Sequence, residues 1–280
     1  VCNPNNDSIT GRVITEEGVG IADVSISIEG TSNFVPPFSY FFSNLTDSLG
    51  YYYLSSQDPI IESYAIIPER DDNPLNGVTT YDLVLISKHI IATEPLNSPY
   101  KMIAADANQS GSVTSFDIVE LRKLILGIYT ELPNNTSWRF VDSSFVFPNP
   151  LNPFQTGFPD TIPFSNTPPY NFIGIKVGDV NNTTVPNFQA AAEERFEGTV
   201  YFDTEHREVQ IGDVFDLKFN ASERLEGCQF TLETAGLEIL EILPGEGMSK
   251  DNFALFPQKS LLTMAWETGG NASFTLKVKA

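Results

Sequence analysis

One motif that occurs twice constrains the fold of this chain of 280 residues more than any other feature. Residues 71–90 and residues 106–125 each read as a polar, acidic loop followed by a helix with apolar side chains at i, i+3 and i+7. At one fixed offset three loop positions coincide: Asp71 with Asp106, Asn73 with Asn108, and Asp82 with Asp117. We therefore predict an internal repeat of two loop-helix units.

The second copy has the oxygen spacing of a calcium-binding loop. Calcium takes about six to eight oxygens, and a twelve-residue loop supplies them from positions 1, 3, 5, 7, 9 and 12, using a backbone carbonyl at position 7. In the second copy these positions hold Asp106, Asn108, Ser110, the carbonyl of Ser112, Thr114 and Asp117. Gly111 lies at the sharp turn, where a positive φ is expected. We predict a calcium site here, with one- or two-oxygen binding by Asp117 left open.

The first copy fits the same pattern less well. Asp71, Asn73 and Asp82 are in place, but Leu75 stands where a side-chain oxygen is needed and Gly77 comes one position late. We expect weaker or altered calcium binding there. The alternative for either loop is a plain turn and helix N-cap, since Asp, Asn, Ser and Gly favour both. Two copies in register favour calcium.

The pair resembles the type I dockerin module, through the two loops and the run from Asn76 to Ile90. That run is most similar to dockerin-type segments in large secreted proteins of Bacteroidetes-type bacteria. The resemblance implies bound calcium and docking onto a cohesin-type protein. It places partner-contacting positions on both helices: Thr80, Tyr81, Ser87 and Lys88 on the first, and Ser115, Phe116, Arg122 and Lys123 on the second.

Those partner positions include basic residues in an otherwise acidic chain. Lys88, Arg122 and Lys123 would suit an acidic partner surface. An ordinary solvated helix face is the alternative.

The flanking regions resemble β-sandwich families. The order of Gly11-Arg-Val, residues 24–30 and Tyr51-Tyr-Tyr is similar to the carboxypeptidase-regulatory-like sandwich. The runs at 212–221 and 229–233 look like the first strands of a cohesin-type jelly roll that is shorter than a whole cohesin.

The domain prediction follows from these resemblances. It divides the chain into a sandwich at 1–68, the repeat pair at 69–130, an ordered connector rich in Pro, Asn and Phe at 131–195, and an incomplete cohesin-like sandwich at 196–280. The predicted fold class is mainly β and multidomain, with two immunoglobulin-like or jelly-roll β-sandwiches flanking a small α-helical, EF-hand-like pair. In the connector, Asp179 and Asn181 either form a turn or add oxygens to a metal.

Composition excludes several function classes. Sixteen Lys and Arg against 36 Asp and Glu give a net charge of −20, which disfavours nucleic acid and anionic membrane surfaces. No apolar run is long enough for a membrane helix. The two cysteines, Cys2 and Cys228, are too few for a disulfide framework, and a single bridge or two thiols remain open. The histidines, His89 and His206, lie in different predicted domains, and no catalytic motif occurs, so we predict no enzyme.

Three functions remain open. The first is a calcium-stabilised structural or adhesive segment of a large secreted or cell-surface bacterial protein, including the subunit of an extracellular filament. The second is a docking module whose partner is another copy of the chain or a cohesin-like or dockerin-like protein. The third is the accessory region of a secreted enzyme whose catalytic domain lies outside this sequence. We favour the first, and we expect the chain to be a fragment.

Overall fold

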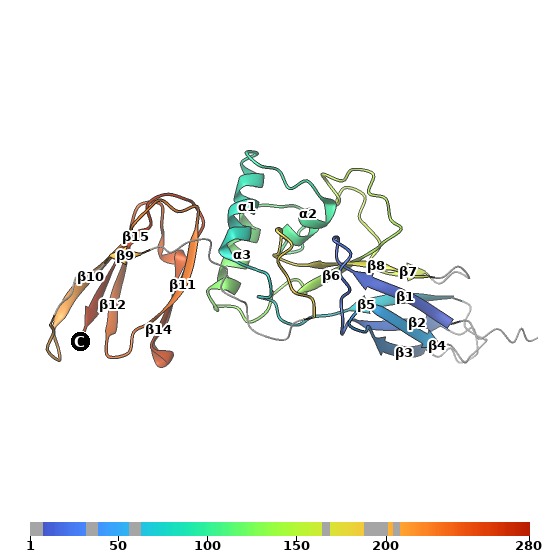
Figure 1. Cartoon of the computed structure of the whole chain (residues 1–280), viewed down its shortest axis with the longest axis horizontal. Helices are drawn as coiled ribbons and strands as arrows, with labels where there is room; N and C mark the ends of the chain where they lie inside the picture. Colours follow the sequence, from blue (N-terminus) through green and yellow to red (C-terminus); the bar gives the residue numbers. More distant parts are fainter. Residues whose placement is uncertain (1–7, 32–38, 56–62, 164–168, 188–200, 204–207) are drawn as a thin grey trace, which may run out of the picture.

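The computed structural model describes residues 8–31, 39–55, 63–163, 169–187, 201–203 and 208–280. Within these residues the chain is mainly β, with several sheets and three short α-helices (Figure 1). A β-rich part lies at each end of the molecule and the helices lie between them (Figure 1). Cys2 and His206 fall outside the described residues.

Eight strands form the N-terminal sandwich. They are β1 (Ser8–Ile14), β2 (Ser25–Thr31), β3 (Ser39–Leu45), β4 (Tyr51–Ser55), β5 (Ser63–Glu69), β6 (Trp138–Asp142), β7 (Ile162–Pro163) and β8 (Phe172–Lys176). One sheet has the order β4-β1-β8-β6 and the other the order β3-β2-β5-β7. Ile9, Ile26 and Phe172 are fully buried members of one cluster that joins both sheets. Burial of such side chains on alternating strand positions is the main source of sandwich stability.

Residues of the predicted connector at 131–195 take part in this sandwich. β8 pairs in parallel with β1 and antiparallel with β6, while β7 pairs with β5. Trp138 and Phe140 are buried in the sandwich core, whereas Phe147 packs into the cluster around the helices. The helical repeat is therefore an insertion between β5 and β6.

The repeat forms α1 (Thr80–Ile90) and α3 (Ser115–Ile125), joined by α2 (Pro99–Ala105). α1 and α3 each begin with a capping box, because a Thr at the N-cap is followed three residues later by an Asp whose carboxylate accepts the N-cap amide. The fully buried Leu83, Ile86, Leu121 and Leu124 form the shared core. Of the apolar stripe that predicts the two helices, Leu83, Ile86, Ile118 and Leu121 are buried and Ile125 is half-buried, whereas Ile90 is 38% exposed.

α2 does not follow from the repeat pattern. Its N-cap is Ser98, whose Oγ accepts a hydrogen bond from Tyr100 N at 3.1 Å. Pro99 is the first helical residue, a position where its missing N–H costs nothing and its fixed φ suits the helix. The same proline that rules out a continuous helix through this connection starts a new one.

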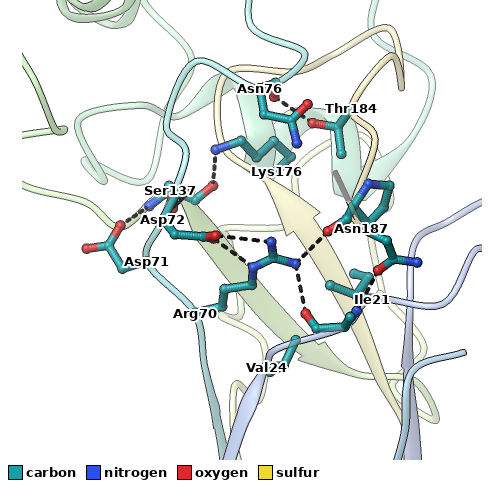
Figure 2. A network of polar contacts seen from close by, with 12 residues as sticks. Ile21, Val24, Arg70, Asp71, Asp72, Asn76, Ser137, Lys176, Thr184 and Asn187 are labelled. Atoms are coloured by element: carbon teal, nitrogen blue, oxygen red, sulfur yellow. Dashed lines mark hydrogen bonds and ion pairs between the residues drawn. The ribbon is translucent and has the colours of Figure 1, made fainter. Parts of the chain in front are cut away.

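Arg70 ties the sandwich to the repeat (Figure 2). Its side chain is 5% exposed, forms an ion pair with Asp72 and donates to the carbonyls of Ala22 at 2.9 Å and Pro186 at 2.8 Å. The guanidinium also lies over the Trp138 ring, 5.2 Å from its centre. A buried guanidinium with all these partners fixes the end of β5 against two other segments.

The C-terminal sandwich contains β9 (Phe202–Asp203), β10 (Val214–Ala221), β11 (Cys228–Glu233), β12 (Glu238–Pro244), β13 (Phe253–Phe256), β14 (Leu261–Trp266) and β15 (Ser273–Lys279). Its sheets have the orders β12-β15-β10-β9 and β11-β14-β13. Leu262, Trp266 and Leu276 are buried in its core. Among the described residues, no helix has the length and apolar character needed to cross a membrane.

Candidate functional site

The second loop gathers oxygen atoms around Asp106. Its Oδ1 accepts a hydrogen bond from Ser110 N at 2.8 Å, and its Oδ2 accepts one from Gly111 N at 2.9 Å. Asn108 Oδ1 also accepts from Ser110 N, at 3.0 Å. Ser110 Oγ donates to the Ser112 carbonyl at 3.2 Å. The oxygens at loop positions 1, 3, 5 and 7 therefore lie in one hydrogen-bonded group.

Asp117 closes the same group from the start of α3. Its Oδ1 accepts from Asn108 N at 3.1 Å, and its Oδ2 accepts from Thr114 N at 2.8 Å. The last loop position is thus bonded to position 3 and to the N-cap at once. The structure brings together all the residues that the sequence predicts for this loop.

The electrostatics of this loop favour a cation. Asp106 and Asp117 are 1% and 0% exposed. Burial raises the pKa of Asp106, and the neighbouring charge of Asp117 raises it further, against amide hydrogen bonds and Arg139, which lower it. A cation between two buried carboxylates would relieve both effects. The donors are all oxygen, the ligand type that calcium prefers, so the residues fit that ion.

Carboxylates supply only part of this donor set. Within the described residues, no three His, Cys, Asp or Glu side chains form a group suited to a metal ion. The second loop contributes two carboxylates, and its other donors are an amide, a hydroxyl and a carbonyl. Such a mixed set is usual for calcium loops.

The first loop is arranged differently. Asp82, which is 0% exposed, accepts Thr79 N on Oδ2 at 2.9 Å, as Asp117 does with its own N-cap. Its Oδ1 accepts from Val180 N, at 3.0 Å, which belongs to the segment after β8. Asp71 is exposed and its Oδ1 accepts from Ser137 N at 2.8 Å (Figure 2). Asp71 and Asp82 are therefore bonded to different segments. Asn73 is half-buried with a φ of 48°.

Asp82 is a buried carboxylate beside another carboxylate, Asp179. Burial raises the pKa of Asp82 to about 7, and the nearby carboxylate of Asp179 adds to the rise, although hydrogen bonds from Thr79 and Val180 lower it. Burial also raises the pKa of Asp179. A buried pair of carboxylates is costly unless a cation accompanies it.

Part of the predicted partner face contacts the C-terminal sandwich of the same chain. Thr80 donates to Gln229 Oε1 from both its backbone nitrogen, at 2.7 Å, and its hydroxyl, at 2.8 Å. Lys88 lies 3.4 Å from a carboxylate oxygen of Glu226. Arg122 forms an ion pair with Glu267, whose side chain is 3% exposed. The contact therefore joins α1 and α3 to β11, to the residues just before it and to the residue after β14.

Apolar packing and close approach complete this contact. Leu126 is buried with Ala254 and Ala265, and its carbonyl accepts from Thr263 Oγ1 at 2.8 Å. Gly227 lies so close to α1 that an added Cβ would fall 3.1 Å from Val84 Cγ2. Only a residue without a side chain fits there without a shift.

Comparison with known proteins agrees with the repeat geometry. Residues 73–126 match the family model of the dockerin type I domain. No curated protein matches the sequence. Among solved structures, the full-length major pilin SpaD from Corynebacterium diphtheriae matches with 10% identity and a TM-score of 0.28, over 100% of this chain and 57% of the pilin chain. This chain thus spans less than two thirds of the pilin, and a TM-score this low does not establish a shared fold.

The other predicted partner residues of the dockerin-type region, residues 73–126, do not share one environment. Tyr81 and Phe116 are 52% and 72% exposed. Ser115 is exposed and Ser87 is half-buried. Lys123 lies 5.1 Å from the centre of the Tyr129 ring and 3.1 Å from its hydroxyl. The helix face is thus divided between a part bonded within the chain and a part open to solvent.

Sequence reasoning missed the residues that meet the dockerin-type region from the C-terminal sandwich. Gln229, Glu226 and Glu267 lie far along the chain from the helices, and no local pattern marks them. The sequence contains one indirect indication of this contact: the basic residues on α1 and α3 predict an acidic partner surface, and Glu226 and Glu267 supply acidic side chains.

Proposed function

We propose that this chain is a non-catalytic, calcium-stabilised structural or adhesive segment of a large secreted or cell-surface bacterial protein. The dockerin-type region serves as the joint between two β-rich parts. One observation carries this proposal: the side of α1 and α3 that would receive a partner is bonded to the C-terminal sandwich of the same chain through Thr80, Lys88 and Arg122.

Calcium would act on this joint through the second loop. The ligands are Asp106, Asn108, Ser110, the Ser112 carbonyl and Asp117, and the bound ion supplies positive charge beside the two buried carboxylates, Asp106 and Asp117. Asp117 is also the capping residue of α3. An ion bound to this carboxylate would hold the start of α3 in place. At the other end of α3, Leu126 packs against the C-terminal sandwich. The loop and the sandwich contact are linked through one rigid helix.

A specific observation favours a second candidate, a docking module for another protein. Tyr81 and Phe116 occupy equivalent positions in the two repeats, and both rings are more than half exposed. Large exposed aromatic side chains are common anchors of protein interfaces. The partner would be another copy of the chain, which would merge the two candidates in a filament subunit, or a cohesin-like or dockerin-like module. The accessory role beside a catalytic domain is compatible with either candidate.

Light scattering on the intact chain with excess calcium separates the two candidates. The joint predicts a monomer at all concentrations, because the polar contacts of α1 and α3 are already made within the chain. The double variant Tyr81→Ala and Phe116→Ala should then behave identically, since exposed side chains contribute little to folding. Growth in mass with concentration that this double variant abolishes would instead establish docking between chains and reject the purely internal joint.

A further inference from the structure

The segment after β8 reproduces the first half of the second calcium loop. Residues 179–183 read Asp-Val-Asn-Asn-Thr, and residues 106–110 read Asp-Ala-Asn-Gln-Ser, so both follow the pattern Asp-x-Asn-x-Ser/Thr. The fourth residue of each has a positive φ, 61° for Asn182 and 56° for Gln109. Both segments therefore make the same turn with the same kinds of oxygen donors.

The hydrogen bonds of the two segments also correspond. Asp179 accepts Thr183 N on Oδ1 at 3.1 Å and Thr184 N on Oδ2 at 2.7 Å. Asp106 accepts the amides four and five residues later in the same way, at 2.8 and 2.9 Å. Each Asp occupies the position of the first ligand of a calcium loop.

The second half of this loop comes from the residues before α1. Thr183 Oγ1 donates to the Gly77 carbonyl at 3.1 Å, just as Ser110 Oγ donates to the Ser112 carbonyl at 3.2 Å. Gly77 lies five residues before Asp82, the same spacing that separates Ser112 from Asp117. The Gly77 carbonyl thus corresponds to the position 7 carbonyl of a calcium loop, although it lies in a different part of the chain from Asp179 and Thr183.

Asp82 completes the correspondence. Its Oδ1 accepts the amide of Val180 at 3.0 Å, where Asp117 Oδ1 accepts that of Asn108 at 3.1 Å. The donating amide belongs to Val180, the second residue of segment 179–183, whereas in the second loop it belongs to Asn108, the third residue of segment 106–110. This one-residue difference is the main departure between the two arrangements.

An unsatisfied oxygen points to a missing ligand. Asn181 Oδ1 is buried and has no hydrogen-bond partner. In the second loop the equivalent Asn108 Oδ1 accepts Ser110 N. A buried oxygen without a partner is rare in folded proteins and calls for an explanation such as an ion. Two buried carboxylates accept amides of this segment: Asp179 Oδ1 accepts Asn181 N at 3.3 Å, and Asp82 Oδ1 accepts the neighbouring Val180 N at 3.0 Å.

The buried amine of Lys176 is hydrogen-bonded to another segment. Lys176 donates to the Ser137 carbonyl at 3.2 Å and lies 5.7 Å from the centre of the Trp138 ring (Figure 2). Its side chain is thus engaged beside β6 and not hydrogen-bonded to either carboxylate.

We propose a second calcium site that is assembled from two separate segments of the chain. Its ligands are Asp179, Asn181, Thr183, the Gly77 carbonyl and Asp82, and it takes no oxygen from Asp71 or Asn73. This inference rests on the proposed function in that it adds a second ion to the calcium-stabilised joint. The ion would tie α1 to the segment that follows β8, and so to the N-terminal sandwich.

Calcium titration of the intact chain by calorimetry, with direct metal analysis, tests the site. The wild type should bind two ions, and Asp179→Asn and Asp106→Asn should each bind one. Asn181→Ala removes a carboxamide whose oxygen has no hydrogen-bond partner, so the chain should fold normally while one of the two affinities falls by about tenfold or more. The matched control Asp71→Asn should keep both ions.

The other possible outcomes overturn the second site, its ligand set, or the proposed function as well. A wild type that binds one ion, lost with Asp106→Asn, overturns the second site and leaves the proposed function standing. Two ions that persist in Asp179→Asn and Asn181→Ala, or one lost with Asp71→Asn, place the second ion in the contiguous first loop and overturn the assembled site. No bound ion at all overturns both proposals.

Discussion

Replacing Arg122 by alanine is expected to weaken the contact between the dockerin-type region and the C-terminal sandwich by about 3–5 kcal/mol. Glu267 has a side chain only 3% exposed, and Arg122 is its ion-pair partner. Without the guanidinium, a buried carboxylate is left without its counter-charge. Differential scanning calorimetry should show the C-terminal sandwich melting at a lower temperature, separately from the rest of the chain.

Neighbouring and compensating substitutions control for this effect. Lys123→Ala, next along α3, removes a cation whose side chain is 36% exposed, so the melting temperature should stay close to that of the wild type. The charge swap Arg122→Glu with Glu267→Arg should recover part of the loss if the pair forms within one chain. An Arg122→Ala variant that melts like the wild type would contradict the contact.

Replacing Asp106 by alanine should lower the melting temperature in excess calcium far more than replacing Asp71. Asp106 is buried and accepts two loop amides, and it is the first ligand of the proposed site. Loss of an ion present at about 100 times its dissociation constant alone removes roughly 2.7 kcal/mol. Asp71 is exposed and accepts Ser137 N, so Asp71→Ala should cost about 1 kcal/mol.

Calorimetry of both variants in calcium and in chelator gives the comparison. In chelator the gap between wild type and Asp106→Ala should shrink, because the wild type also loses its ion. If Asp71→Ala proves the more damaging variant, the assignment of the stronger ion site to the second loop is contradicted.

The sequence predicts those features of the fold that depend on residues close together along the chain. The polar loop and the apolar stripe through Leu83 and Ile86 predict α1, and the matching residues predict α3. The donor set around Asp106 is contiguous, so its spacing alone describes a calcium loop. These features depend on residues a few positions apart, where backbone geometry is nearly determined.

Contacts between distant segments could not be predicted in this way. The residues around Phe172 do not predict that its strand, β8, pairs with β1. Strand pairing depends on how side chains from all the strands pack in the sandwich core. The contact of Thr80 with Gln229 has the same character. Thr183 is the third oxygen donor of an Asp-x-Asn-x-Thr pattern that the sequence shows. Its hydrogen bond to the Gly77 carbonyl, however, is known only from the folded structure.

Hydrogen–deuterium exchange of the intact chain in calcium and in chelator tests the central claim most directly. If calcium holds the joint, chelation should speed exchange in the loop at 106–117 and at the start of α3, where Asp117 accepts Asn108 N and Thr114 N. Amides in the core strands β1 and β14 should remain protected, because their hydrogen bonds involve no loop oxygen. Equal protection of the loop with and without calcium would contradict the account.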